Sequence, residues 1–440
     1  DSVLSVARID ASCSKILKAK EWLGLTKPVQ LDTLNVLERA TIKKRTLLTR
    51  RLEEAALTLV KNTENLLPIV ALKNKKIGVL TLGDSDSDAF VNQLKRYADV
   101  KVFDTSMDEP SDFDQLIISI HKSTESPWKS YKIASYEKEL IKKYSEHTSV
   151  SLVVFANPYS LLNANYLTNV NAILLSYQNT QTMQSLAAQS IFGAIAINGK
   201  LPVSLNSDFT AGLGIETKPL NRLKYTEAAE VQLNSDTLAL IDSIANYAIK
   251  IKATPGCQVL VAKSGKVVYA KSFGYHTYDS IVPVNEFDVY DIASITKISA
   301  TLPILMQKVD AETYDIDESL IEYLSIKDTC TKAELTTREM LAHQAQLWPW
   351  IPFYRETLTE EGGPNPAIYS SNKEGDFQIK VAHNIYMNES YLDTIVDRVI
   401  HSKMWEEKGY KYSDLAYYIL KEIIEQQEGN SLKDLIQERL

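Results

Sequence analysis

A serine and a lysine lie three residues apart where an apolar, helix-like pattern begins. Segment 291–297 reads DIASITK, and the apolar residues 302–306 follow it. Residues at this spacing lie on one face of a helix, so Ser294 and Lys297 would meet in its first turn. An amine held beside a hydroxyl can act as its general base or adjust its reactivity. The spacing therefore makes Ser294 a candidate nucleophile with Lys297 as its partner.

This spacing alone is a weak signal, because Ser-x-x-Lys occurs by chance in many helices. The alternative is an ordinary helix start with a solvated lysine. The surrounding chain has to distinguish the two.

Length and composition limit the possible classes of protein. A chain of 440 residues exceeds one ordinary core, so two or three domains are expected. The net charge of −8, from 56 acidic and 48 basic residues, argues against a nucleic-acid partner. No run of about 18 apolar residues exists, so we expect no transmembrane segment. Three widely spaced cysteines and no histidine cluster predict neither a disulfide framework nor a metal site.

The first half alternates strand-like and helix-like segments. Helices are predicted at 1–25 and 31–62 from their apolar spacing, and further helices at 90–97, 135–145 and 180–192. Short apolar runs that suit buried parallel strands lie between them, at 76–82, 100–103, 115–120, 151–156 and 172–176. This alternation predicts βαβ units and a mostly parallel sheet.

The second half has a different order of elements. We place a domain boundary near residues 225–230, after a proline-containing stretch with few apolar positions. A helix at 236–251 and a hairpin of strands at 258–262 and 267–274 follow. The Ser294 helix, a loop-rich segment at 348–377 and a helix at 414–428 complete an expected α+β domain.

The first half resembles glycoside hydrolase family 3. Segment 8–25 is similar to the last helix of that family's barrel, segment 55–68 to its linker, and segment 184–204 to the closing motif of its second domain. The resemblance implies a three-layer αβα sandwich. The nucleophilic carboxylate of the family lies in the barrel, so neither catalytic carboxylate of glycoside hydrolysis can be assigned here. Asp84 and Asp86, in a polar turn after a strand, are better explained as solvated residues than as an acid lent to that site.

The second half resembles the serine β-lactamase and penicillin-binding-protein superfamily, nearest its class C and esterase branch. Segments 255–259 and 265–269 are similar to its opening hairpin, and segment 287–297 to the approach to its nucleophile. Segment 335–343 resembles its LLxHxSGL motif, although QAQ follows His343. YSD at 412–414 stands where the family has Tyr-x-Asn.

The resemblance implies roles for five residues. Ser294 would be the nucleophile, Lys297 the amine that helps deprotonate it, and Tyr412 a phenol that carries the proton to the leaving group. The backbone N–H of Ser294 would supply one oxyanion donor. Asp414 and His343 are the candidates for substrate-binding or orienting residues. Asp414 could instead cap the following helix, or it orients Tyr412 or Lys297, and His343 is a turn residue rather than a catalyst.

The expected fold is thus a multidomain α/β plus α+β protein, an αβα sandwich followed by a serine β-lactamase-like domain. The domains would be 1–62 (barrel helix and linker), 63–230 (sandwich) and 231–440 (serine hydrolase). No Lys-Thr-Gly or His-x-Gly follows Tyr412, so we expect the last domain to be truncated and incomplete at its C-terminus.

Three functions remain open. The first is a serine acyl hydrolase acting on a small molecule, glycan or peptide, with cell-wall or amino-sugar compounds favoured and no cofactor. The second is the accessory part of a family 3 β-N-acetylglucosaminidase, and the third is a non-catalytic scaffold or binding module. By resemblance we expect a bacterial, exported protein, periplasmic or at the cell surface. The sequence leaves the oligomeric state open.

Overall fold

The computed structural model describes residues 4–27, 43–126, 128–162, 164–324, 326 and 330–440. Two compact units divide the chain, Asp1–Asp288 and Val289–Leu440. The predicted domain boundary near residue 230 does not coincide with this division, and it stays a prediction.

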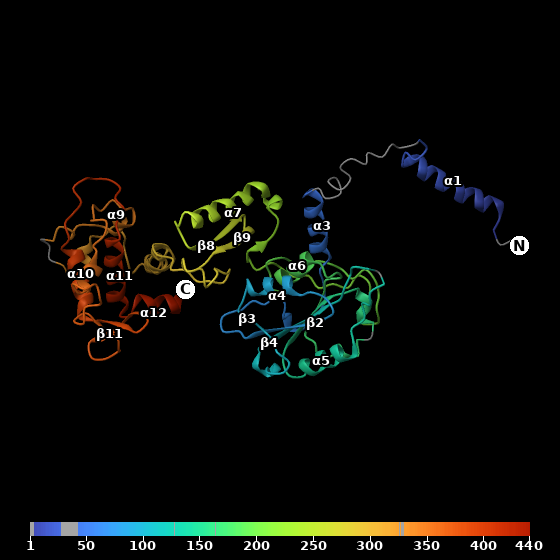
Figure 1. The fold of residues 1–440 in the computed structure, drawn as a ribbon, viewed down its shortest axis with the longest axis horizontal. Helices are drawn as coiled ribbons and strands as arrows, with labels where there is room; N and C mark the ends of the chain where they lie inside the picture. The colour runs from blue at the N-terminus through green and yellow to red at the C-terminus, as the bar shows by residue number, and fades with distance from the viewer. Residues whose placement is uncertain (1–3, 28–42, 127, 163, 325, 327–329) are drawn as a thin grey trace. The chain divides into compact units, whose positions relative to one another are not determined.

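A six-stranded sheet forms the centre of the first unit (Figure 1). Its strand order is β1-β6-β5-β4-β2-β3. Strands β2 to β6 pair in parallel, and only β1 runs antiparallel, beside β6. The strands are β1 (Thr58–Asn62), β2 (Ile77–Gly83), β3 (Val100–Val102), β4 (Gln115–His121), β5 (Val150–Phe155) and β6 (Ala172–Leu175).

Helices cover both faces of this sheet. Helices α4 (Asp88–Lys95) and α6 (Gln181–Ile191) lie on one face and α5 (Ser135–Ser145) on the other, as Figure 1 shows. Along β4, Ile118 packs in the core on the α5 side and Ile117 in the core on the α4 and α6 side. Apolar residues on both sides of each strand are typical of a parallel sheet buried between helices. The predicted three-layer αβα sandwich is confirmed.

The predicted helix at 31–62 is wrong at its end. Helix α3 (Lys43–Ala56) stops at Ala56, and residues 58–62 form β1. Leu57 and Leu59 are fully buried, and Leu59 pairs with Leu174 of β6. The apolar residues here are spaced as in a helix, but a strand position in the sheet buries them between the two helical layers. This burial favours the strand over the helix. The part of this prediction at 31–42 lies outside the described residues.

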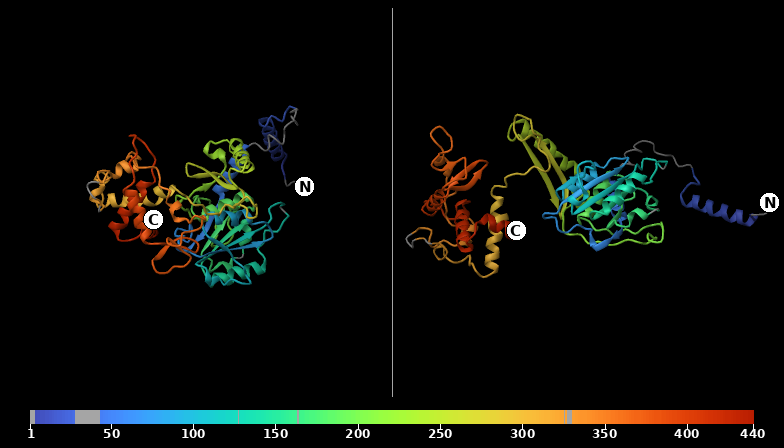
Figure 2. Two further views of the ribbon diagram at one scale, coloured as in Figure 1. Left: turned by 60° about the vertical axis from the view of Figure 1, so that its left-hand side comes forward. Right: turned by 90° about the horizontal axis from the view of Figure 1, so that it is seen from below.

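A small three-stranded sheet follows in the first unit. It contains β7 (Lys224–Tyr225) and the predicted hairpin, β8 (Gly256–Lys263) and β9 (Lys266–Gly274), in the order β7-β9-β8. Ser264 and Gly265 both have positive φ, as a tight two-residue hairpin turn requires. Helix α7 (Ser235–Lys250) lies along the hairpin (Figure 2, right-hand view).

The second unit is built around helix α11 (Leu415–Glu428). Its buried residues Ile419, Ile423 and Ile424 share a core with Ile304 and Met340. The neighbouring helices are the π-helical turn η6 (Lys297–Thr301), α8 (Leu302–Asp310), α9 (Thr337–Leu341), α10 (Ser390–Ile400) and α12 (Leu432–Arg439).

The segment predicted as a loop gives way to regular structure at its end. Strand β11 (Phe377–Ala382) begins at Phe377 and pairs with β12 (Ile385–Asn388), which also pairs with β10 (Tyr369–Ser370). The residues of β11 are half-buried or exposed and mix polar with apolar types, so the alternation that predicts a strand is weak in this sequence.

The remaining elements are helix α1 and several short 3₁₀ turns. Helix α1 (Val6–Trp22) has no buried residue among those described. The 3₁₀ turns are η1 (Thr63–Asn65), η2 (Pro110–Asp112), η3 (Pro158–Leu161), η4 (Asn165–Leu167), η5 (Ala228–Val231), η7 (Leu320–Glu322) and η8 (Phe353–Thr357).

A buried histidine lies at the carboxyl end of β4. The ring of His121 stacks on Phe155 at 4.6 Å, and its nitrogens lie 2.8 Å from Asn179 Oδ1 and 2.9 Å from Ser119 Oγ. Burial lowers the pKa of His121 to about 4, against a smaller opposing effect of Asn179. The folded sandwich therefore favours the neutral ring.

We expect this histidine to make the sandwich sensitive to acid. The unfolded chain takes up the proton near pH 6.5 and the folded chain near pH 4, so stability is full above pH 6.5 and falls as the pH drops towards 4. In chemical unfolding, wild type should lose about 2–3 kcal/mol more over this range than His121→Asn. His147→Asn, at an exposed position of the same unit, should behave like wild type. If the unfolding free energies of all three proteins depended equally on pH, His121 would not be the source of the acid sensitivity.

Candidate active site

Ser294 occupies a fixed turn at the start of a helix in the second unit. Ala293, before it, has a φ of 42°, which a residue with a side chain rarely adopts. The N–H of Ala293 donates to Asp291 Oδ1 at 2.7 Å. The N–H of Lys297 donates to the carbonyl of Ser294 at 3.1 Å, which closes the first helical turn. The backbone thus presents Ser294 at the helix entrance.

The structure brings Ser294 and Lys297 together. Lys297 Nζ donates to Ser294 Oγ at 2.9 Å. Lys297 also begins the π-helical turn η6, a wider turn that is often found at functional sites. The hydroxyl and the amine that the spacing predicted to meet are therefore in direct contact.

Asp414 holds the same lysine from a distant part of the chain. Its Oδ1 lies 2.7 Å from Lys297 Nζ, across 117 residues of sequence. Asp414 makes no side-chain capping bond to α11. Ser413 Oγ instead accepts from the N–H of Leu415 at 3.1 Å. Of the roles considered for Asp414, the geometry shows contact with Lys297 and no helix cap.

Two tyrosine rings complete the surroundings of the lysine. The ring centroids of Tyr412 and Tyr417 each lie 5.5 Å from Lys297 Nζ, within the range of cation–π attraction. Tyr417 was missed from the sequence, although it lies three residues after Asp414 and so shares its side of α11.

These contacts decide the ionisation of the lysine. Burial lowers the pKa of Lys297, but hydrogen bonding to Asp414 and Tyr412 and their charges outweigh it, and the net pKa lies above the ordinary value. Lys297 is therefore an ammonium at neutral pH. An ammonium donates hydrogen bonds and cannot accept a proton.

His343 supports the Tyr412 segment from the side. It has a φ of 56°, and its ring packs against that of Tyr412 at 4.4 Å. Its Nδ1 accepts from the N–H of Ser413 at 3.3 Å, and its carbonyl accepts from the N–H of Lys411 at 2.8 Å. Burial and the Lys297 charge lower the pKa of His343, which suits a neutral acceptor. This geometry is that of a turn residue.

The two aspartates considered in the sandwich have ordinary turn contacts. Asp84 Oδ1 accepts from the N–H of Ser123, and Asp86 Oδ1 from the N–H of Asp88, and both aspartates are exposed. Among the described residues no cluster of His, Cys, Asp or Glu is arranged to hold a metal ion.

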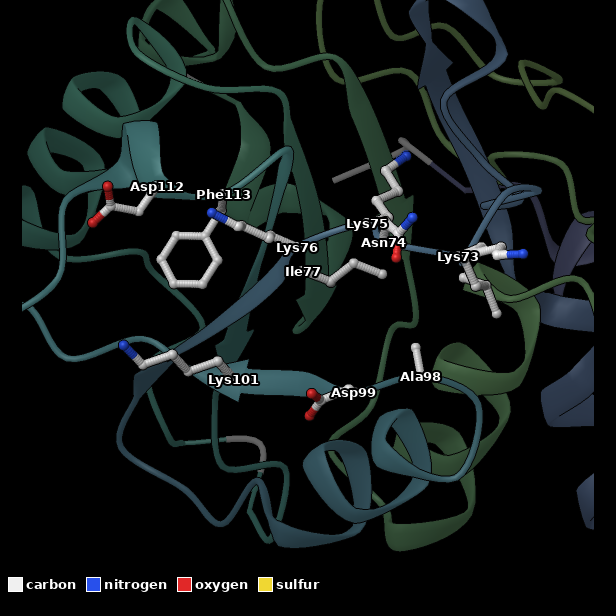
Figure 3. A pocket seen from close by; sticks show the side chains of 11 residues that line it. Lys73, Asn74, Lys75, Lys76, Ile77, Ala98, Asp99, Lys101, Asp112 and Phe113 are labelled. Carbon is white, nitrogen blue, oxygen red and sulfur yellow. The ribbon is translucent and has the colours of Figure 1, made fainter. Parts of the chain in front are cut away.

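A separate cavity of about 720 Å³ lies at the amino ends of β2, β3 and β4. Figure 3 shows Lys73 and Lys101 at opposite ends of it, with their ammonium groups pointing apart. Lys101 is paired with Asp108. Diverging lysines do not form a convergent binding site, so the Ser294 site is the stronger candidate.

Comparison with protein families identifies both halves of the chain. Residues 57–235 match the glycosyl hydrolase family 3 C-terminal domain, and residues 242–440 match the beta-lactamase family. The chain therefore carries a family 3 C-terminal domain followed by a β-lactamase domain, as the motifs indicated. The β-lactamase domain indicates a serine hydrolase, and the family 3 domain indicates a relation to glycoside hydrolases.

Individual relatives are distant. Protein flp of Staphylococcus aureus is 26% identical over 196 residues, which make up 44% of this chain and 34% of that protein. The chain thus spans about a third of the length of this curated relative.

Solved structures with partial similarity include members of both classes. An octameric penicillin-binding protein homologue from Pyrococcus abyssi is 21% identical, covers 46% of this chain and 42% of its own, and has a TM-score of 0.35. A family 3 β-N-acetylglucosaminidase from Paenibacillus sp. str. FPU-7 is 18% identical, with coverages of 46% and 40% and a TM-score of 0.29.

The ionisation of Lys297 can be tested directly. In Asp414→Asn the main charge that favours the ammonium is gone, so the pKa of Lys297 should fall. NMR titration of isotopically methylated lysines, assigned with Lys297→Arg, would measure it. Asp397→Asn, at an exposed position of the same unit, should leave the value unchanged. A Lys297 pKa that is equal in wild type and Asp414→Asn would contradict the ion pair.

Proposed function

We propose that the protein is a serine acyl hydrolase that acts through an acyl-serine intermediate on Ser294. The observation that carries the proposal is the contact of Ser294 Oγ with a lysine that Asp414 holds in place. The match of residues 242–440 to the beta-lactamase family supports it. The substrate is a small molecule, glycan or peptide, with cell-wall or amino-sugar compounds favoured by the family 3 domain.

Tyr412 is the proposed base because Lys297 is protonated. Lys297 Nζ lies 5.5 Å from the centroid of the Tyr412 ring, so the phenol is next to the lysine that contacts Ser294. Ser294 Oγ attacks the acyl carbon as its proton passes to Tyr412. The leaving group takes that proton and departs, and an ester on Ser294 remains. In the second step water attacks this ester while Tyr412 takes its proton. Tyr412 passes that proton to Ser294 Oγ as the acid is released.

The backbone N–H of Ser294 is the proposed first oxyanion donor. Throughout the described part of the chain it has no acceptor, and it lies at the start of a helix, where the dipole favours negative charge. A substrate oxygen placed there would be stabilised as it becomes an anion.

Covalent labelling tests the nucleophile. A fluorophosphonate probe should label the purified protein, and Ser294→Ala should abolish the labelling. Ser299→Ala is the matched control, because Ser299 lies on the same helix and its hydroxyl only donates to the carbonyl of Ile295. Equal labelling of wild type and Ser294→Ala would exclude this nucleophile.

Removing the phenol tests the base. Tyr412→Phe keeps the ring against His343 and Lys297 but removes the proton carrier, so the acylation rate should fall by about 10²-fold or more. Stopped-flow labelling with the same probe measures it. A variant that acylates at the wild-type rate would assign the base elsewhere.

A second candidate is an accessory role in a family 3 β-N-acetylglucosaminidase, which the match at residues 57–235 supports. That match is to the C-terminal domain, and neither of the two carboxylates that glycoside hydrolysis needs is assigned in residues 1–440. We therefore expect no hydrolysis of nitrophenyl N-acetylglucosaminide by this chain. Measurable turnover that survives Ser294→Ala would favour a glycosidase.

An exported location, periplasmic or at the cell surface, is also proposed on the family resemblance. Within the ranges that the structure describes, no helix is long and apolar enough to cross a bilayer.

A further inference from the structure

A second cleft, of about 450 Å³, lies within the second unit. No residue of the proposed catalytic group lines it. Its volume falls in the range of about 300–1,000 Å³ that is usual for small-molecule sites. One wall comes from the loop after α9 and the other from the end of α10, and the lining side chains include Trp348, Ile351, Asp397, Arg398, His401 and Lys403.

The two walls of this cleft are joined through the backbone. Leu347 and Met404 form an isolated antiparallel bridge. The N–H of Trp405 donates to the carbonyl of Gln346 at 2.6 Å. Gln346 Nε2 donates in return to the carbonyl of Trp405 at 3.0 Å. The cleft is therefore held open by bonded segments on both sides.

A buried lysine fixes the wall at the end of α10. Lys332 is fully buried, and its ammonium donates to the carbonyl of Ile400 at 2.9 Å and to that of Ser402. A cation at this place stabilises the carbonyl groups at a helix end. Backbone acceptors on both walls are thus already bonded, which disfavours a peptide that pairs with a strand edge. Recognition in this cleft falls to the side chains.

Trp348 provides an aromatic surface in the cleft. Its ring packs against that of Trp405 with centroids 4.9 Å apart, and the residue stays 42% exposed. Its carbonyl accepts from Ser413 Oγ at 2.7 Å, which fixes its backbone. A pyranose ring has a face of C–H groups, and the electron-rich face of an indole attracts such slightly positive groups. A fixed, partly exposed indole therefore suits a sugar ring.

Charged side chains supply the polar contacts. Asp397 and His401 pair at 3.0 Å, yet their side chains stay 70% and 67% exposed. The Lys403 ammonium has no hydrogen bond or ion pair in the described part of the chain. Arg398 is neutralised by Glu356. Hydroxyl groups both donate and accept, so they can bind a carboxylate and an ammonium together. The balanced charges favour a neutral ligand over an ion.

We propose that this cleft is a saccharide-binding site, in which the Trp348 indole stacks on a neutral pyranose ring and Asp397 and Lys403 bind its hydroxyl groups. Binding here needs no acyl transfer. The site therefore goes beyond the proposed hydrolase function and does not depend on it.

Saturation-transfer NMR with cellotriose and chitotriose tests the site. The purified protein should bind at least one of these two neutral saccharides, with the strongest transfer to ring C–H protons. Trp348→Ala should raise the Kd of the bound saccharide at least about tenfold, because the stacking surface is lost. Trp348→Phe keeps an aromatic face and should keep most of the affinity.

Two control variants separate this site from the rest of the unit. Trp350→Ala removes an indole that is 51% exposed but does not line the cleft, and it should bind the saccharide as wild type does. Ser294→Ala should also bind as wild type, because the nucleophile takes no part. Near-UV circular dichroism and the thermal unfolding midpoint establish that each variant is folded.

Each outcome decides the proposal. If neither saccharide binds to wild type, or if folded Trp348→Ala binds as tightly as wild type, the cleft is not a saccharide site. Binding that is lost in Ser294→Ala and kept in Trp348→Ala would place the saccharide at the nucleophile and overturn the assignment. Saccharide binding that depends on Trp348, in a protein whose Ser294 is not labelled, would contradict the hydrolase function and support this site.

Discussion

The contact between Lys297 and Asp414 is the interaction on which the candidate site depends. It joins the entrance of one helix to the entrance of another across 117 residues of sequence. The core beneath it, where α8 and α11 pack, sets the distance between the two entrances. A lone ammonium at this position would lose part of its charge stabilisation to burial, whereas the carboxylate keeps it protonated. Because Lys297 is protonated, we propose Tyr412 rather than Lys297 as the base.

The consequence is a division of roles within the site. Lys297 donates to Ser294 Oγ and cannot remove its proton while it carries its own. Tyr412 is the base that we propose for this reason, and His343 packs against its ring and accepts from the N–H of Ser413. The strained Ala293 adds to this arrangement, since a left-handed residue before Ser294 costs free energy that the fold has to offset.

Much of the fold was predictable because its strands are short, apolar and regularly separated by helices. Strand β4 and helix α5 lie where the sequence places them. Strand β1 was missed because Leu57, Leu59 and Val60 fit a helical spacing as well as a buried strand, and only the pairing with β6 decides between them. Pairing across more than 100 residues leaves no local signal.

In the site, too, contacts between residues close in sequence could be predicted, whereas contacts between distant residues could not. Ser294 and Lys297 are three residues apart, so their meeting follows from helix geometry. The approach of Asp414 to Lys297 could be inferred only from family resemblance, and the sequence left its role open between a cap and an orienting group. The place of Tyr417 depends on how α11 is rotated against η6, which packing determines.

Peptide mapping of an acid-quenched reaction tests the central claim most directly. The protein is mixed with a slowly hydrolysed ester, quenched, digested and analysed by mass spectrometry. The acyl group should be found on Ser294, and it should be absent from Ser294→Ala. An acyl group on another residue, or substrate turnover with no adduct in either protein, would contradict the account.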